Sequence, residues 1–296
     1  MVKEVQLSIG LPVYNGEMYL HQAIDSLLNQ EFKDFELIIS DNASTDKTRA
    51  ICQEYVALDK RVRYYRNDEN MGATWNLNRV FDLSTAKYFM WASHDDFWYL
   101  NYIEECLRAL KSSDHIVLAG SACEEVPTDW VFGGCFKRIL LDPGVTTVGL
   151  KPAERFKLYK RALHNGRNIN ALFYGIYVRD ILAKVMPLKN MIANDHILLS
   201  ELSLLGEFIT VDDILMAKRT GGASVSFKSI AGTLKIKNGF CIKYPYMIRE
   251  ISLQKMTWAA DQMSFLSKVR LSAWSAANYG VLFLRQNYRR IRDLVS

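Results

Sequence analysis

Short apolar runs alternate with amphipathic segments along the first part of the chain. Val5–Leu11 and Glu36–Ser40 are apolar runs with the length of buried strands, and Tyr19–Asn29 repeats apolar residues at the 3.6-residue period of a helix. The next expected elements are a helix from an N-cap at Ser44 or Thr45 to Leu58, strands at Arg61–Arg66, Lys87–Ala92 and His115–Ala119, and helices at Thr74–Leu83 and Asn101–Lys111. Because strands and helices alternate, the pattern predicts an α/β fold with a mostly parallel sheet flanked by helices.

The alternation ends in a stretch that contains several prolines and glycines. Residues 127–144 predict irregular loops and short strands. Helical patterns return at Pro152–Leu163 and Asn194–Leu205, and the chain beyond Gly221–Gly222 is again helical in pattern. We therefore expect one domain over residues 1–225, with halves divided near residue 120, and a helical C-terminal extension over residues 226–296.

The composition fits a folded chain of 296 residues, since 49% of its residues are hydrophobic. Its net charge of +5 is too weak to indicate nucleic-acid binding. The 5 cysteines contain no CxxC motif, which argues against a disulfide framework or a zinc site and favours a reducing, cytoplasmic setting. Neither the N-terminal residues nor the longest uncharged run, Leu271–Leu284, predicts a signal peptide or a membrane span.

Polar residues follow three of the expected strands, at the positions where an open parallel sheet binds its ligands. The first strand leads into Pro12–Gly16, the second into Asp41–Asp46 and the fourth into Ser93–Asp96. Each segment taken alone is explained as a turn, a helix cap or a solvated loop. Placed together at one sheet edge, they predict a binding site.

The glycine patterns that cradle phosphate with backbone amides are missing. The chain has neither GxGxxG after its first strand nor GxxxxGK[ST], which disfavours a dinucleotide-dependent enzyme and a P-loop nucleotide hydrolase. The adjacent carboxylates of Asp95 and Asp96 are instead the hard oxygen ligands that Mg²⁺ or Mn²⁺ shares with substrate phosphates. We therefore expect a diphosphate bound through a divalent metal.

Four segments resemble the family 2 glycosyltransferases of GT-A fold, in order and at suitable spacing. They are VQLSIGLPVYNG, QEFKDFELIISDNASTD, NMGATWNLN and SHDD. The resemblance covers about residues 5–220 and implies inverting transfer of a sugar from a nucleoside diphosphate sugar, preferably a UDP sugar, to an acceptor hydroxyl. It places the nucleotide sugar in residues 1–120 and the acceptor in residues 121–225. The implied acceptor is a saccharide or lipid-linked saccharide in bacterial polysaccharide or cell-envelope synthesis.

The resemblance also implies roles for individual residues. Those that it places around the nucleotide are Pro12, Tyr14, Asn15, Asp41, Asn42, Asn76 and Asp95. Asp96 corresponds to the metal ligand, with Mn²⁺ or Mg²⁺ as the cofactor. Two departures from the family pattern are visible, since Ser93–His94 replace the first acid of the metal-binding motif and Asn42 stands where many members have a second aspartate.

Inversion requires a base that removes the proton of the acceptor hydroxyl. In the family this base is an acid at the start of a helix after the middle region, and Asp195 matches it; capping of that helix is the alternative role. The residues expected near the acceptor or the diphosphate are His94, Gly175, His196 and Arg219. Gly175 would admit the sugar closely. Lys218 or Arg219 would neutralise the diphosphate where members often have a histidine, with an exposed basic loop as the alternative.

Aromatic residues occur at the expected cleft and in the tail. Trp75, Trp91 and Trp98 are near enough to stack on a sugar or base, although Trp91 lies within a strand and favours core packing. The tail from Trp258 to Arg292 mixes aromatic and basic residues, which suits either a surface helix on anionic lipid or a helix packed across the domain. The first interpretation makes the protein peripheral at the cytoplasmic face of the membrane.

Two alternatives to a glycosyltransferase differ in the activity they predict. A non-catalytic sugar-nucleotide-binding partner subunit accounts for the altered acidic motif and the missing histidine. A nucleotidyltransferase has the same general architecture, but the glycine- and arginine-rich N-terminal loop of that class is absent from this chain.

Overall fold

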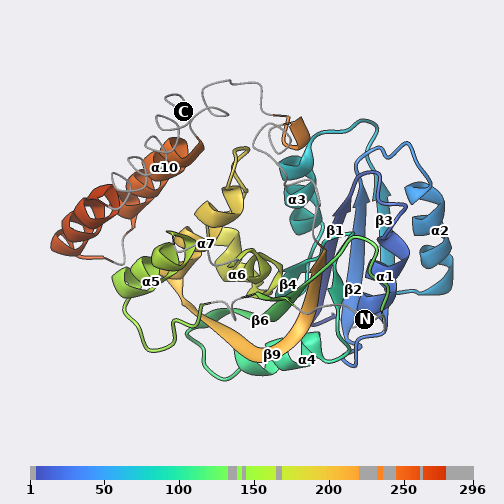
Figure 1. Ribbon diagram of the computed structural model, residues 1–296, viewed down its shortest axis with the longest axis horizontal. Helices are drawn as coiled ribbons and strands as arrows, with labels where there is room; N and C mark the ends of the chain where they lie inside the picture. The colour runs from blue at the N-terminus through green and yellow to red at the C-terminus, as the bar shows by residue number, and fades with distance from the viewer. Residues whose placement is uncertain are drawn as a thin grey trace, which may run out of the picture.

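The computed structural model describes residues 5–132, 139–141, 145–164, 169–219, 232–235, 245–260 and 263–277. Within these residues, helices flank a nine-stranded mixed sheet, which confirms the predicted α/β class (Figure 1). The strands are β1 Leu7–Val13, β2 Phe35–Asp41, β3 Val62–Arg66, β4 Tyr88–Trp91, β5 Phe97–Trp98, β6 Ile116–Val126, β7 Ile139–Leu141, β8 Ile176–Val178 and β9 Glu207–Arg219. The helices are α1 Leu20–Leu28, α2 Thr48–Leu58, α3 Ala73–Asp82, α4 Tyr102–Leu110, α5 Pro152–His164, the 3₁₀ helix η1 Ile169–Tyr174, α6 Arg179–Leu182, the 3₁₀ helix η2 Ala183–Val185, α7 Asn194–Leu205 and α10 Pro245–Ala259.

The strand directions decide which loops meet. The order across the sheet is β3-β2-β1-β4-β8-β6-β9-β5, and β7 pairs with β6. The strands β3, β2, β1 and β4 run parallel, whereas β8 runs antiparallel to both β4 and β6. Two reversals restore the first direction, so β6 and its parallel neighbour β9 point the same way as β1. We call the side of the sheet where β1, β2, β4 and β9 end, and where β8 begins, the carboxyl edge.

The predicted middle region differs most from the structure. Where the sequence predicts a strand that ends at Ala119, β6 continues to Val126, and β9 is a 13-residue strand beside it that the apolar pattern does not predict. The pairing of β6 with β9 shifts between Val211 and Ile214, leaving the exposed Asp212 and Asp213 outside the register. This irregularity breaks the alternation by which a strand is recognised in sequence.

The start of α2 also differs from the prediction. The helix begins at Thr48, and neither Ser44 nor Thr45 is its N-cap. The Ser44 amide donates to Asp41 Oδ1 (2.8 Å), and the carboxylate of Asp46 accepts from the Thr48 amide (3.0 Å). Asp41 and Ser44 therefore form a turn after β2, and Asp46 bonds the backbone at the start of α2.

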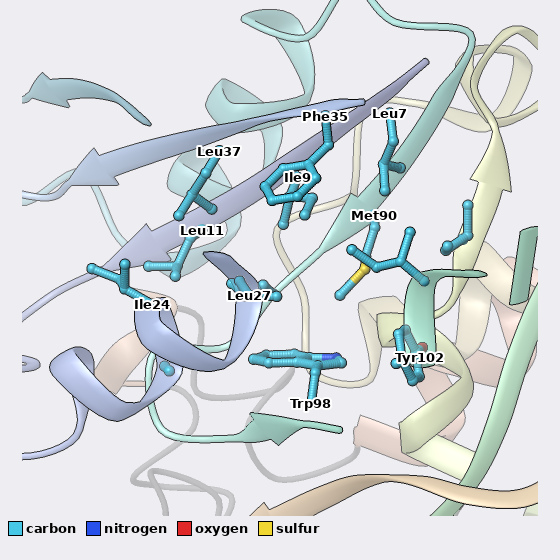
Figure 2. Packing of buried hydrophobic residues seen from close by; sticks show 14 of the residues in the cluster. Leu7, Ile9, Leu11, Ile24, Leu27, Phe35, Leu37, Met90, Trp98 and Tyr102 are labelled. Atoms are coloured by element: carbon cyan, nitrogen blue, oxygen red, sulfur yellow. The ribbon is translucent and has the colours of Figure 1, made fainter. Parts of the chain in front are cut away.

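The two faces of the sheet carry separate cores. On one face, β1, β2 and β4 side chains pack against α1 and α4 in the cluster that Figure 2 shows, which includes Leu7, Ile9, Leu11, Ile24, Leu27, Phe35, Leu37, Met90, Trp98 and Tyr102. On the other face, Phe89 and Trp91 pack with α3, α5 and α7. Because successive strand residues point to opposite faces, Met90 faces the first core while its neighbours Phe89 and Trp91 face the second.

The three tryptophans expected near the cleft have different environments. Trp91 is fully buried and stacks on Phe173 with ring centroids 4.8 Å apart, which confirms core packing. Trp98 is also fully buried, so its expected stacking on a ligand is wrong. Trp75 is 36% exposed at the start of α3, where the guanidinium of Arg79 lies 5.2 Å from its ring centroid.

The described C-terminal helices pack against α5 and α7. A small apolar cluster joins α5 and α7 to α10 and residues 265–277, and its members are Phe156, Met191, Ile197, Leu204, Leu253, Met263 and Leu271. The expected boundary near residue 225 and the tail beyond residue 277 lie outside the described residues. The expected division near residue 120 falls inside β6, so the two halves share one sheet. In the part of the chain that the structure describes, no helix is long and apolar enough to cross a membrane.

A buried ion pair fixes this packing. The ammonium of Lys160 on α5 donates to Glu250 Oε2 on α10 (2.7 Å), and the side chains of both residues are almost completely shielded from solvent. The hydroxyl of Ser275 contacts Lys160 Nζ and donates to Glu250 Oε1. One polar cluster therefore connects three helices from separate parts of the chain.

The ion pair predicts a non-additive pattern of stability. Glu250→Leu removes the carboxylate from a buried ammonium and should lower the free energy of unfolding by about 3–5 kcal/mol. The double variant Lys160→Met with Glu250→Leu should recover most of this loss, because both charges are replaced by apolar side chains. Urea unfolding followed by circular dichroism measures both, with the exposed Glu54→Leu as control. Equal losses in the single and double variants would contradict this account.

Candidate functional site

The carboxyl edge brings together segments that are far apart in the sequence. The turns after β1, β2 and β4 lie there because these strands are parallel neighbours. The end of β9 joins them because β9 runs in the same direction, and the residues before β8 join because β8 runs the opposite way. The prediction that polar loops converge at one sheet edge is confirmed in this geometry.

Asn15 ties the first two turns to each other. Its amide donates to Ser44 Oγ (2.9 Å), and its side-chain Oδ1 accepts from the Thr45 amide (2.9 Å). Asn15 has a positive φ of 51°, in the left-handed region that asparagine tolerates better than most residues. Tyr14, 43% exposed, and the half-buried Pro12 precede it at the same edge. These side chains are placed where a ligand of the edge would meet them.

Asp41 is a buried carboxylate whose bonds shape the second turn. It accepts from the Ser44 amide and from the Tyr64 hydroxyl (2.7 Å to Oδ2), and the guanidinium of Arg66 pairs with the same Oδ2. Arg66 also donates to the Ser44 carbonyl (2.9 Å). The side chain of Asp41 is 0% exposed, so its charge is balanced within the protein.

Asn42 organises the loop that follows β3. Its Oδ1 accepts from Asn67 Nδ2 and from the Met71 amide (both 2.9 Å), while its Nδ2 donates to Asn70 Oδ1 (2.9 Å). Asn76, on α3, is equally buried and exchanges bonds with Ser40: its Nδ2 donates to the Ser40 carbonyl (2.8 Å) and its Oδ1 accepts from Ser40 Oγ (2.6 Å). Both asparagines thus hold protein segments together at the predicted nucleotide position.

Asp95 and Asp96 form the acidic pair after β4. Asp96 is 4% exposed, and burial together with the charge of Asp95 raises the pKa of Asp96 to about 7. The charge of Lys218 and the Arg219 amide, which donates to Asp96 Oδ1 (3.1 Å), work in the opposite direction. The Ser93 hydroxyl donates to Asp95 Oδ1. The pair is therefore a concentrated negative charge in a site that is largely shielded from water.

His94 lies between the acidic pair and the first turn. A Cβ atom added at Gly16 would lie 2.9 Å from His94 Cδ2, so the histidine ring packs directly over this glycine. The Gly16 amide in turn donates to Thr48 Oγ1 at the start of α2 (2.8 Å). His94 thus lies beside the predicted donor turn, as the sequence order implies.

Tyr174 is a site residue that the sequence reasoning missed. Burial raises its pKa well above the usual range, and the charges of Asp96, Asp95 and Asp195 all add to this shift. Its hydroxyl is therefore within electrostatic reach of both acidic turns. Tyr174 is the last residue of η1, immediately before Gly175 and the antiparallel β8, and no local pattern in the segment FYGIYVR predicts this direction.

The packing around Gly175 explains why this position has no side chain, and the explanation differs from the expected one. A Cβ atom at this position would lie 2.5 Å from the Ala119 carbonyl oxygen and 2.8 Å from Leu118 Cδ1. The absent side chain therefore makes room for β6, and the expectation that it makes room for a sugar is not supported.

Lys218 and Arg219 take opposite directions at the end of β9. The ammonium of Lys218 lies 5.9 Å from the centroid of the Tyr174 ring, on the side of the acidic pair. The guanidinium of Arg219 instead donates to the carbonyls of Thr128 (3.1 Å) and Trp130 (2.8 Å) and contacts Gln22. Successive residues of a strand face opposite sides, which separates the two cations.

The alternative of an exposed basic loop is wrong for Arg219, whereas its expected place near the diphosphate stays a prediction, since the charges of Asp95 and Asp96 act on its guanidinium. Its side chain is buried, with 7% of the residue exposed, and its guanidinium also lies 4.3 Å from the centroid of the Tyr19 ring. Burial lowers the pKa of Arg219. Its contacts hold residues 127–130 against α1, while its backbone amide holds Asp96.

Asp195 stands in the first turn of α7, as predicted. Its amide is bonded to Asn194 Oδ1 (2.8 Å), and His196 Nε2 lies 3.8 Å from its Oδ2. Asn194 Nδ2 donates to Thr74 Oγ1 on α3 (3.1 Å), which brings the starts of the two helices together. The helix dipole favours a carboxylate at this position, so a purely structural role for Asp195 is also consistent with its place.

The acidic pair has the donor chemistry that a divalent cation needs. Within the described ranges, no group of three or more His, Cys, Asp or Glu side chains is suited to hold a metal ion. Mg²⁺ and Mn²⁺ at diphosphate sites use one or two carboxylates and take their other ligands from phosphate and water. Asp95 and Asp96 supply hard oxygen ligands, and a bound cation would offset both the burial and the charge of Asp95 that raise the pKa of Asp96.

Comparison with known families gives a direct match. Residues 8–184 match the family model described as glycosyl transferase family 2, which is well over half of the chain. A Rickettsia typhi protein described as an uncharacterized glycosyltransferase is 41% identical over 117 residues, 38% of this chain and 36% of that protein. The GalNAc(5)-diNAcBac-PP-undecaprenol beta-1,3-glucosyltransferase of Campylobacter jejuni is 25% identical over 174 residues, 57% of this chain and 56% of that protein. The matched segments thus span less than two thirds of these curated relatives.

Solved structures show the same fold at low sequence identity. S. aureus TarS, crystallised with UDP, has a TM-score of 0.60 at 16% identity, covering 92% of this chain and 70% of that chain. The mannosyltransferase PcManGT of Pyrobaculum calidifontis, in complex with GDP-Man and Mn²⁺, has a TM-score of 0.55 at 13% identity, covering 98% and 81%. These similarities confirm the GT-A fold that the sequence predicts.

The contacts of Arg219 predict that its substitution destabilises residues 127–130. Arg219→Lys keeps the charge but cannot bond several carbonyls in the planar arrangement of a guanidinium. We expect residues 127–130 to loosen and the variant to lose about 2–3 kcal/mol of stability, since hydrogen bonds of a charged group are removed from a buried position. Thermal unfolding and limited proteolysis measure the two effects, with Lys184→Arg on η2 as the control. A proteolysis rate in residues 127–130 equal to that of the wild type would contradict this role.

Proposed function

The chain belongs to glycosyl transferase family 2, and from this membership we propose that it transfers a sugar from a nucleoside diphosphate sugar to an acceptor hydroxyl with inversion at the anomeric carbon. The observation that carries the proposal is the acidic pair of Asp95 and Asp96 at the carboxyl edge, where the Arg219 amide donates to Asp96 and Lys218 Nζ lies 5.9 Å from the centroid of the Tyr174 ring. Asp195 in the first turn of α7 is a separate carboxylate. An acidic pair for a metal-bound diphosphate and a separate carboxylate for the acceptor proton are the groups that this transfer requires.

The donor nucleotide is proposed to lie on the turns after β1 and β2. Tyr14 and Asn15 are exposed there and are the proposed contacts, with Pro12 bordering them. Asp41, Asn42 and Asn76 act mainly by holding the shape of the pocket, because their polar groups are bonded within the protein. UDP is the preferred nucleotide, supported by the TarS complexes with UDP and UDP-GlcNAc. Asp95 is the proposed ribose contact.

Asp96, with Asp95 beside it, is proposed to hold Mn²⁺ or Mg²⁺ against the diphosphate. When bound, the ion supplies Lewis-acid stabilisation of the departing nucleoside diphosphate. PcManGT, which has the same fold, was solved with Mn²⁺ and a nucleotide sugar. The ammonium of Lys218, one of the two cations that the sequence offers for this role, is proposed to face the same charge.

Asp195 is the proposed general base. It accepts the proton of the acceptor hydroxyl as the hydroxyl oxygen bonds to the anomeric carbon. The bond from that carbon to the diphosphate oxygen breaks on the opposite face, and its electron pair leaves with the nucleoside diphosphate. His196, whose Nε2 lies 3.8 Å from Asp195 Oδ2, is proposed to orient the carboxylate. The proposed acceptor is a saccharide or lipid-linked saccharide of bacterial polysaccharide synthesis, supported by the name of the C. jejuni relative.

Two aspartate variants separate donor binding from transfer. Purified protein should gain thermal stability with UDP and Mn²⁺ together, and Asp96→Asn should abolish this metal-dependent gain because it removes a ligand charge. Asp195→Asn should keep the gain yet lower turnover by about a hundredfold or more, the usual contribution of a general base. Thermal unfolding with UDP, GDP, CDP and dTDP measures binding, and release of UDP from UDP sugars measures turnover. Asp114→Asn, exposed at the opposite end of β6, is the control.

The results of these experiments distinguish the possible roles. A normal turnover rate in Asp195→Asn would show that Asp195 is not the general base. Metal-dependent binding without turnover on any donor and acceptor would favour the non-catalytic partner subunit. If GDP alone raised the unfolding temperature, GDP would take the place of UDP as the proposed donor nucleotide.

Membrane contact is proposed through the outer face of the C-terminal helices. The exposed side chains there include Trp258, Phe265 and Leu266, of which Phe265 is 73% exposed, and the rings of Trp258 and Phe265 lie 5.9 Å apart. Lys255 and Arg270 are exposed on the same helices. Aromatic and basic side chains together suit the boundary between lipid headgroups and acyl chains.

A double substitution tests this contact more cleanly than truncation, since removal of residues 270–296 would also delete the buried Leu271 and Ser275. Phe265→Ser with Leu266→Ser should reduce co-sedimentation with phosphatidylserine vesicles by about tenfold or more, because two apolar side chains are removed from the interface. Leu58→Ser, equally exposed on α2, is the control. Unchanged binding in the double variant would contradict a membrane role for this face.

A further inference from the structure

A short segment from the C-terminal part of the chain is packed beside the site. Residues 232–235 lie next to the start of α3, far from α10, as the orange piece in Figure 1 shows. Leu234 is 8% exposed and forms a small buried cluster with Ile192, against which Ala73 and Ala193 pack. Ala73 begins α3 on the donor side, and Ala193 directly precedes the helix that carries Asp195. One leucine therefore touches both sides of the proposed site.

The contact on the donor side is close and polar as well as apolar. Gly72 has a φ of +90°, and a Cβ atom there would lie 3.3 Å from the Leu234 carbonyl oxygen. The ammonium of Lys235 donates to the Asn70 carbonyl. The turn 70–72 has bonds of its own besides these, because Asn70 Oδ1 accepts from the Gly72 amide (2.9 Å) and from Asn42. We therefore expect this turn to keep its shape when Leu234 is truncated.

The contact on the base side meets a turn that is less well supported. Ala193 has a φ of +62°, a conformation that an alanine adopts only when its surroundings impose it. No side chain caps the first turn of α7 at this residue. Among the described residues, the contacts that hold this turn against α3 include the packing of Ile192 and Ala193 on Leu234 and the bond from Asn194 to Thr74 (3.1 Å). Removal of Leu234 would take away the packing contact.

We propose that residues 232–235 form a clasp that holds the start of α7 against the start of α3, and that Leu234 is a positioning residue for Asp195. The catalytic part of this proposal rests on the proposed function. Its physical content is that the strained turn at Ala193, and with it the direction of the Asp195 carboxylate, persists because Leu234 fills the space between two helix starts. The donor turn is predicted to be nearly independent of the clasp.

Hydrogen exchange tests the clasp without any assumption about activity. In Leu234→Ala, the amides of Asp195 and Ile197, which are bonded to Asn194 Oδ1 and to the Ala193 carbonyl, should exchange about tenfold faster or more, because the local opening of this turn becomes easier. Amides of β2 should exchange at the wild-type rate, which shows that the variant is folded. Leu234→Met, which keeps an apolar side chain of similar volume, should restore protection. Leu58→Ala, on an exposed leucine, is the control.

Hydrolysis of a UDP sugar tests the catalytic part. Water takes the place of the acceptor: its oxygen bonds to the anomeric carbon, the bond to the diphosphate breaks, UDP leaves with the electron pair and the proton passes to Asp195. In Leu234→Ala, kcat should fall by about tenfold or more while KM and the thermal shift with UDP change by less than about twofold, because a small displacement of a catalytic group is costly to the rate. Leu234→Met should recover kcat.

The outcomes separate the two proposals. Unchanged exchange at Asp195 and Ile197 in Leu234→Ala overturns the clasp, whatever the activity. Faster exchange at these amides with an unchanged kcat retains the structural contact and overturns the positioning role. Failure of wild-type protein to bind UDP or to release it from UDP sugars contradicts the proposed UDP-sugar transfer, and the exchange result then decides the clasp alone.

Discussion

The direction of one short strand determines where the chemistry of this molecule is assembled. β8, only three residues long, runs antiparallel between β4 and β6. Because of this reversal, the residue that precedes β8 and the residues that end β9 arrive at the same edge as the turns after β1, β2 and β4. Tyr174 and Lys218 therefore stand beside Asp95 and Asp96. With β8 parallel, Tyr174 would lie at the opposite end of the sheet. The missing side chain of Gly175 lets the chain before β8 pass close to the Ala119 carbonyl.

Asp41 and Asp96 are both buried at this edge, but their surroundings differ. Asp41 is surrounded by donors, and Arg66 balances its charge, so it serves as a structural centre for the second turn. Asp96 is placed beside a second carboxylate instead, and burial with this like charge raises the pKa of Asp96. A fold that only needed stability would not keep two acids together in a shielded position. The difference singles out the pair after β4 as the place where a cation and a diphosphate are expected.

Backbone strain is distributed around the same edge. Asn15 and Ala43 have positive φ values of 51° and 62° in the turns after β1 and β2, and Ala193 has 62° before α7. Conformations of this kind cost about 1–3 kcal/mol each in residues other than glycine and persist only where neighbouring contacts impose them. The hydrogen bonds of Asn15 to Ser44 and Thr45 supply that constraint in the first turn. Near Asp195 the packing of Ile192 and Ala193 on Leu234 and the bond from Asn194 to Thr74 contribute to that constraint.

The sequence by itself determined the elements of the first four strands, the polar turns that follow β1, β2 and β4, and the family to which these segments belong. Those features are local, because an apolar run, a helical period or a pair of adjacent acids is visible within a few residues. The tertiary structure alone decided the reversal at β8, the register irregularity in β9 and the contact of Leu234 with Ile192. It also separated Lys218 from Arg219 and brought Tyr174 to the acids. These depend on pairing between segments far apart in the chain, where strand direction and packing prevail over local preference.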